Sequence, residues 1–128
     1  MFTFLKKWIG IFSLMLVLIP CVNAKELSQV SKVEIQQLLE RLSASKCQFN
    51  RNGSWYTSEE ASAHLTKKLD YVVEKRKVST TEEFIELAAS KSSTSGKPYQ
   101  VKCGDSGPLE SAAWLTTQLQ KMRSENKK

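Results

Sequence analysis

Apolar residues recur at helical spacing in four segments of the chain. The first segment has its apolar positions at Ile35, Leu38, Leu39 and Leu42. It is preceded by Ser31-Lys32-Val33-Glu34, a pattern in which a serine and a glutamate three residues apart can satisfy the free amides at a helix start. We therefore predict a helix over residues 32–44 that begins with this capping box.

Two further helices are predicted from the same kind of start. Thr57-Ser58-Glu59-Glu60 precedes an apolar stripe that ends near Lys75, and Thr80-Thr81-Glu82-Glu83 precedes a short stripe that ends near Ser90. The fourth helix should start near Ser111, because Ala112, Leu115, Leu119 and Met122 fall on one face. The tail, residues 124–128, is expected to be frayed.

Short extended segments lie between these helices. Residues 47–49 and 54–56 flank Asn52-Gly53, a pair that favours a tight hairpin because both residues accept positive φ. With that turn, Phe49 should lie opposite Tyr56. A third strand is predicted over residues 99–103, where apolar and polar residues alternate.

These elements predict a fold of the α+β class. About four helices should pack on a small antiparallel sheet made of the hairpin and one further strand. The strand at 99–103 should pair with the one at 47–49, because this pairing brings Cys47 close to Cys103.

The segment before the first helix has the pattern of a secretory signal peptide. Lys6 and Lys7 precede an apolar run, and Val22-Asn23-Ala24 provides the small residues of a cleavage site after Ala24. A membrane anchor is the alternative, but the run over residues 8–22 is shorter than the about 20 residues that a span needs. A lipoprotein signal at Cys21 is disfavoured by the proline before it.

Cleavage there would leave residues 25–128 as a single exported domain with no transmembrane span. The formal net charge of the 128-residue chain is +6, and it falls to +4 without Lys6 and Lys7. Of the three cysteines, Cys47 and Cys103 would remain, and an even pair in an oxidising compartment predicts a disulfide. The alternative is a catalytic thiol, which would need the single histidine, His64, as its base.

Candidate binding residues gather around two loops. Arg51 and Asn52 belong to the hairpin turn, and Ser93, Ser95 and Lys97 belong to a polar loop over residues 90–98. Turn geometry explains most of these residues, and Ser95-Gly96-Lys97-Pro98 lacks the earlier glycine and the hydroxyl residue of a phosphate loop. The functional alternative is an anion contact from Arg51 beside Lys97.

His64 lies beside the apolar stripe of its predicted helix, where a lone histidine is usually hydrogen-bonded at the edge of the core. As a general base it would need a nucleophile within reach, such as Ser93 or Ser95. This pairing defines the enzymatic alternative, a small envelope hydrolase. The scattered cysteines and single histidine match no zinc pattern, so we predict no metal and no cofactor.

Five basic residues lie in the second half of the predicted helix at 58–75 and directly after it: Lys67, Lys68, Lys75, Arg76 and Lys77. Interleaved acids at Asp70 and Glu74 favour a solvated face, although an anionic polymer or lipid is an alternative partner. No exposed aromatic residues for base stacking are evident, so we predict no nucleic-acid partner.

Several blocks of sequence resemble one known family. They include Arg51-Asn52-Gly53, Glu60-Ala61, His64-Leu65, Glu83-Phe84-Ile85, Ala89-Ser90, Ser92-Ser93 and Ser95-Gly96-Lys97-Pro98-Tyr99. The chain from Ile35 to Trp114 is similar to the YfeK-like proteins, small secreted bacterial proteins that carry a domain of unknown function. The resemblance implies export to the periplasm. It also implies that Cys47 and Cys103 stabilise the fold, because the family includes members without this pair.

The resemblance brings no activity, so function is predicted from the residues alone. We expect a non-enzymatic binding or accessory module of the bacterial envelope, whose partner is an anionic envelope ligand or another envelope protein. Its site would form where the Arg51 turn, His64 and the 93–97 loop meet.

Overall fold

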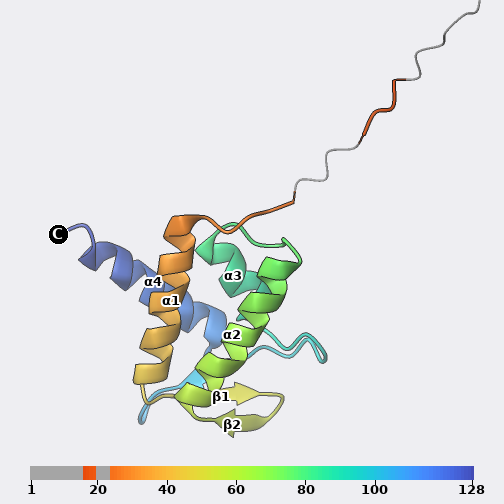
Figure 1. Cartoon of the computed structure of the whole chain (residues 1–128). Helices are drawn as coiled ribbons and strands as arrows, with labels where there is room; N and C mark the ends of the chain where they lie inside the picture. The colour runs from red at the N-terminus through yellow and green to blue at the C-terminus, as the bar shows by residue number, and fades with distance from the viewer. Residues whose placement is uncertain (1–15, 20–23) are drawn as a thin grey trace, which may run out of the picture.

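The computed structural model describes residues 16–19 and 24–128, and it has the predicted α+β architecture (Figure 1). The elements are α1 (Gln29–Ala44), β1 (Gln48–Arg51), β2 (Ser54–Tyr56), α2 (Ser58–Glu74), α3 (Thr81–Ala88), β3 (Gln100–Lys102), β4 (Leu109–Glu110) and α4 (Ser111–Glu125). The small sheet lies at one end of the domain. The helices α1 and α2 stand side by side above it, with α3 and α4 behind them.

The start of α1 differs from the sequence prediction. The N-cap is Ser28, whose Oγ accepts a hydrogen bond from the Ser31 amide, and the helix begins at Gln29. The predicted box at Ser31 is wrong because Ser28 caps the helix earlier, so Ser31 and Glu34 lie inside α1, and the Glu34 carboxylate is used elsewhere. It accepts two hydrogen bonds from Arg123 of α4, at 2.8 and 3.0 Å, and one from Thr81 of α3. The helix start is therefore still capped locally, by Ser28, and the Glu34 carboxylate makes tertiary contacts instead of a capping bond.

The hairpin agrees with the sequence prediction. Asn52 and Gly53 both have positive φ, at 53° and 85°, which matches the twist of the flanking strands. Phe49 pairs with Tyr56 as expected. The strand β1 covers residues 48–51, whereas the predicted strand covered residues 47–49. It starts one residue later and ends two residues later than predicted, so Arg51 is its last residue.

The sheet has four antiparallel strands in the order β2-β1-β3-β4. The predicted pairing of β1 with β3 is confirmed, and Cys47 and Cys103 form a disulfide at the end of that ladder. In the chain-entropy description such a long closed loop stabilises the fold by about 4 kcal/mol. The strand β3 is shorter than predicted, and the two-residue β4 was not predicted because a run so short carries no alternation.

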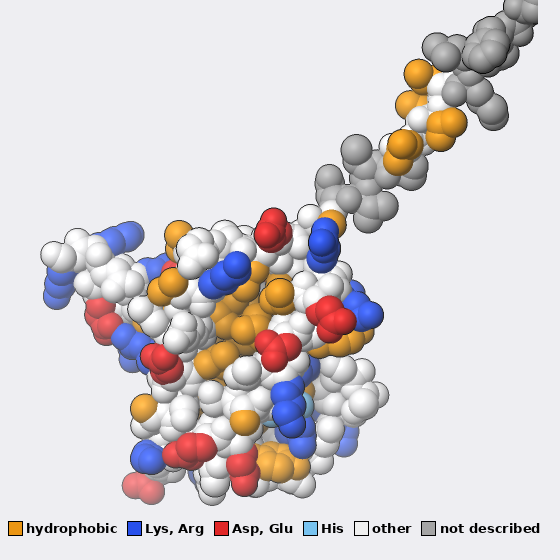
Figure 2. Space-filling model, in the orientation of Figure 1, with side chains coloured by type: hydrophobic (Ala, Val, Ile, Leu, Met, Phe, Trp, Pro, Cys, Tyr) orange, Lys and Arg blue, Asp and Glu red, His pale blue; other side chains and the backbone are white. Residues whose placement is uncertain are grey.

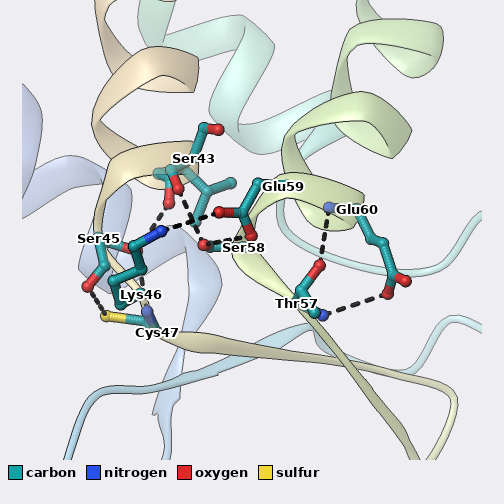
Figure 3. Close-up of polar contacts among 9 residues, drawn as sticks. Ser43, Ser45, Lys46, Cys47, Thr57, Ser58, Glu59 and Glu60 are labelled. Atoms are coloured by element: carbon teal, nitrogen blue, oxygen red, sulfur yellow. Dashed lines mark hydrogen bonds and ion pairs between the residues drawn. The ribbon is translucent and has the colours of Figure 1, made fainter.

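The second helix begins with the predicted capping box (Figure 3). The Thr57 side chain accepts from the Glu60 amide at 3.2 Å, while the Glu60 carboxylate accepts from the Thr57 amide at the same distance. Next to it, the Ser58 hydroxyl donates to the carbonyl of Ser43 at the end of α1. These contacts fasten α2 against α1 directly after the hairpin.

The third and fourth helices differ from prediction at their ends. Thr80 caps α3 by accepting from the Glu83 amide, but the Glu83 carboxylate accepts from Ser79 and Lys25, so the reciprocal half of the box is absent. The helix α3 ends at Ala88, two residues earlier than expected. The helix α4 continues through Ser124 to Glu125, which pairs with Arg41 of α1.

The core lies between the helices and the sheet. It contains Ile35, Leu38, Leu42, Leu65, Phe84, Leu115, Leu119, Phe49, Tyr99 and Val101, each of which is almost fully buried. No helix within residues 16–19 and 24–128 is both long enough and apolar enough to cross a membrane. Most of the predicted signal peptide, including Lys6, Lys7 and Cys21, lies outside the described residues.

Candidate functional site

A cavity of about 380 Å³ opens between the hairpin, the middle of α2 and the polar segment before β3. It is lined by Arg51, Asn52, Ser54, Tyr56, His64, Lys68, Ser92, Ser93, Thr94 and Tyr99. We call it the His64 cavity. It contains four of the six binding residues proposed from the sequence, namely Arg51, Asn52, His64 and Ser93.

Local structure determines which side chains reach this cavity. Arg51 is the last residue of β1, where the turn at Asn52 begins. His64 and Lys68 are four residues apart on α2, which places them on the same face of the helix. Figure 2 shows Lys and Arg side chains gathered beside the imidazole of the chain's single histidine.

Tyr99 connects the groups at the floor of the cavity. Its ring is 1% exposed and packs against Phe49, with ring centroids 5.1 Å apart. Its Oη lies 3.0 Å from Lys68 Nζ, which donates to it, and 3.1 Å from His64 Nε2. Lys68 Nζ also lies 4.8 Å from the centre of the Tyr99 ring. Tyr99 therefore holds one cation and one imidazole in fixed positions.

Arg51 forms the opposite side of the cluster. Its Nη1 lies 2.7 Å from Nδ1 and 3.4 Å from Nε2 of His64. Its guanidinium also lies 4.9 Å from the centre of the Tyr56 ring, and Nη2 donates to Tyr56 Oη at 3.4 Å. The hairpin thus supplies both the cation and the aromatic face that supports it.

Electrostatics makes His64 a neutral residue. Burial lowers the pKa of His64 to about 4, and the positive charges of Arg51, Lys68 and Lys67 add to this effect. A guanidinium can only donate hydrogen bonds, so the contacts assign the ring proton to Nε2, which donates to Tyr99 Oη. Burial also lowers the pKa of Lys68, with Arg51 adding to the effect.

The polar segment is attached to the hairpin through Asn52. The Asn52 amide nitrogen donates to Ser92 Oγ at 3.2 Å, and its side-chain oxygen accepts from Ser95 Oγ. Ser92 is buried and Ser93 is exposed, and both line the cavity. Ser95 therefore reaches the site through Asn52, while Lys97 does not line the His64 cavity.

Sequence reasoning did not name six of the ten lining residues as site residues: Ser54, Tyr56, Lys68, Ser92, Thr94 and Tyr99. Lys68 carried a signal, because it lies one helical turn after His64. The two tyrosines carried none, since an aromatic residue in a short strand or beside one is usually a packing residue. Only the fold shows that the Tyr99 hydroxyl faces Lys68 and His64.

The cluster is cationic and has few acidic neighbours. Within the described part of the chain, no ion pair includes Arg51, Lys67 or Lys68. An adjoining hollow shared by Arg51 and His64 is lined by one acidic residue, Glu60, whose carboxylate already caps α2. This arrangement can supply hydrogen-bond donors and positive charge to an anion.

The same geometry gives no support to hydrolysis. The hydrogen-bond partners of His64 in the described residues are Arg51 and Tyr99, not a serine. An imidazole with a pKa near 4 is also a weak general base at neutral pH. Nor do the described residues contain a group of three side chains suited to holding a metal ion.

Comparison with known sequences shows which family this chain belongs to. Residues 29–123 match a family described as "Family of unknown function (DUF5329)". The chain belongs to the DUF5329 family. The match begins at the first residue of α1 and ends in the last turn of α4, so the DUF5329 region covers all the elements that build the His64 cavity.

A relative supports the same assignment. The chain is 39% identical over 79 residues to "Uncharacterized protein YfeK" from Salmonella typhimurium, and the aligned region covers 61% of this chain and 60% of the relative. The resemblance to YfeK-like proteins inferred from the sequence blocks is thereby confirmed. No solved structure gives a significant match to this DUF5329 chain.

Proposed function

We propose that this protein is a non-enzymatic binding protein, exported to the bacterial envelope, that takes an anionic ligand in the His64 cavity. One observation carries the proposal. Two cations from different elements, Arg51 and Lys68, flank a neutral imidazole in a concave site, and no acidic side chain pairs with either cation in the described residues. Like charges held together without a partner favour an anion.

The hydrogen-bonding capacity of the cluster fits such a ligand. Tyr99 Oη accepts from both Lys68 Nζ and His64 Nε2, so its own hydrogen has no acceptor among the described residues. Lys68 and Arg51 each have further N–H groups beyond those that contact protein atoms. Phosphate, sulfate and carboxylate groups match donors of this kind.

The test is a titration of the folded domain with sulfate and with inorganic phosphate at constant ionic strength. Binding would be followed through the backbone amide NMR signals of residues 51–56, 64–68, 92–97 and 99. Saturable shifts confined to these residues are expected. Arg51→Gln and Lys68→Gln should each weaken binding at least tenfold, because each removes a charge-assisted contact.

Lys121→Gln provides the matched control, since Lys121 is an exposed lysine of α4 that does not line the His64 cavity. It should leave the affinity unchanged. Linear, non-saturable shifts, or equal losses in the control and in Lys68→Gln, would contradict the proposal and leave the cluster a structural feature.

Export is the second part of the proposal. It is supported by the signal-peptide pattern of residues 1–24 and by the disulfide between Cys47 and Cys103, a bond that persists in oxidising compartments. Expression of the full chain in a Gram-negative host, followed by intact mass measurement of the periplasmic fraction, tests it. A product that starts at Lys25 is expected, whereas recovery of the uncleaved chain from the cytoplasm would refute export.

A further inference from the structure

A second hollow meets the His64 cavity from the other side of His64. It has a volume of about 580 Å³ and is lined by His64, Lys67, Lys68, Tyr71, Val72, Lys77, Leu87 and Ser93. We call it the Tyr71 groove. It shares His64, Lys68 and Ser93 with the His64 cavity, so the two hollows adjoin at these side chains.

The walls of the Tyr71 groove are apolar. Tyr71 of α2 is 53% exposed and Leu87 of α3 is 48% exposed, although both are large apolar side chains on packed helices. Val72 is buried at the base of the groove. These two side chains line the same hollow and give it an apolar wall that is exposed to solvent.

The rim of the groove is positively charged. Lys67, Lys68 and Lys77 line it, and Lys77 Nζ lies 5.7 Å from the centre of the Tyr71 ring. The stems of Lys67 and Lys77, which are exposed, extend the apolar wall while their ammonium groups remain at the surface, and the ammonium group of Lys68 points to Tyr99. An apolar groove with a cationic rim, joined to a cationic cavity, is complementary to a molecule that has an acidic head and an apolar chain.

We propose that the ligand of this protein is an amphiphilic anion of low molecular weight. Its acidic head occupies the His64 cavity between Arg51 and Lys68, and its single apolar chain lies along Tyr71 and Leu87. The inference rests on the proposed anion site and adds the class of ligand. Both hollows are concave and of the size that small-molecule sites have, which favours a small amphiphile over a protein surface.

The experiment compares n-octyl phosphate, used below its critical micelle concentration, with inorganic phosphate. Octyl phosphate should bind at least tenfold more tightly, because burial of several methylene groups adds to the same head contacts. Leu87→Asp should remove this advantage and leave the affinity for inorganic phosphate unchanged. Leu87 is 48% exposed and is not one of the buried core side chains.

Leu109→Asp is the matched control, because Leu109 of β4 is 54% exposed and does not line the Tyr71 groove. It should keep the full advantage of the octyl chain. Circular dichroism would verify that both variants fold.

The outcomes separate the two proposals. Equal affinity for the two phosphates, or an octyl advantage that survives Leu87→Asp, would overturn the amphiphile inference and leave the anion site intact. An equal loss in Leu109→Asp would overturn it as well, since the effect would then be one of surface charge. Absence of saturable binding by either phosphate would remove both proposals together.

Discussion

The guanidinium of Arg51 lies 2.7 Å from Nδ1 of His64, so two basic side chains from β1 and α2 are in direct contact. The contact favours a neutral imidazole, because a second positive charge at this distance is repelled in a half-buried site. Lys68 and Lys67 increase the same effect from one turn of α2. The fold thus concentrates positive charge in a hollow and keeps its histidine uncharged.

The first prediction concerns the titration of His64. NMR of the imidazole should give a pKa of about 4, against an ordinary value of 6.5, because burial and the neighbouring cations disfavour the charged ring. Arg51→Gln should raise this pKa, since it removes the cation closest to the ring. Lys97→Gln should not move it, because Lys97 does not line the cavity. A wild-type pKa close to 6.5 would contradict the described contact.

The second prediction links anion binding to pH. An anion beside His64 stabilises the imidazolium, so its pKa should be higher in the complex than its free value of about 4. Between these two values binding takes up a proton, and affinity for sulfate should therefore increase as the pH falls toward 4. Sulfate does not itself titrate in this range. Calorimetry at pH 7, 5.5 and 4.5 would show the trend, and His64→Gln should flatten it.

The third prediction concerns the Glu34 carboxylate, which joins α1 to α3 and α4 through Thr81 and Arg123. Its side chain is 14% exposed, so Glu34→Gln should lower the free energy of unfolding by about 2 kcal/mol, as expected for a charged hydrogen bond. Glu40→Gln, an exposed change on the same helix, should cost less than about 0.5 kcal/mol. Urea denaturation of both variants provides the comparison.

The pH dependence of this contribution has a definite sign. Hydrogen bonds from Arg123 lower the pKa of Glu34 below its ordinary value of 4.5. Stability from this pair is therefore fully present above pH 4.5 and is lost as the pH falls through the lowered pKa. A Glu34→Gln difference that stays constant down to pH 2 would argue against the ion pair.

The fourth prediction tests the turn that positions Arg51. Gly53 has φ of +85°, and no atom lies within 4 Å of where a Cβ would be. Gly53→Ala should therefore cost about 1 kcal/mol through backbone strain alone. Gly107 has equally open surroundings and no such φ, so Gly107→Ala should be neutral or stabilising. Equal effects in thermal unfolding would show that the hairpin does not depend on this φ.

Sequence alone determined the features that depend on neighbours along the chain. The Asn52-Gly53 turn, the capping box at Thr57 and the amphipathic stripes are local, because each is decided within a few residues. The Cys47–Cys103 pair was also predictable, since the predicted cleavage after Ala24 would remove Cys21 and leave one pairing. The presence of Arg51, Asn52, His64 and Ser93 in one cavity was a hypothesis that depended on the strand order.

Only the tertiary structure decided how side chains far apart in the sequence share their partners. Ser31 and Glu34 fit a capping box, yet Glu34 instead accepts hydrogen bonds from Arg123, 89 residues away, because a guanidinium offers a stronger partner than a backbone amide. Tyr99 likewise meets His64 and Lys68 only once β3 lies beside β1. The local sequence pattern limits the helices, turns and caps that each segment can form. Packing against other segments then determines which hydrogen-bond partners its side chains meet.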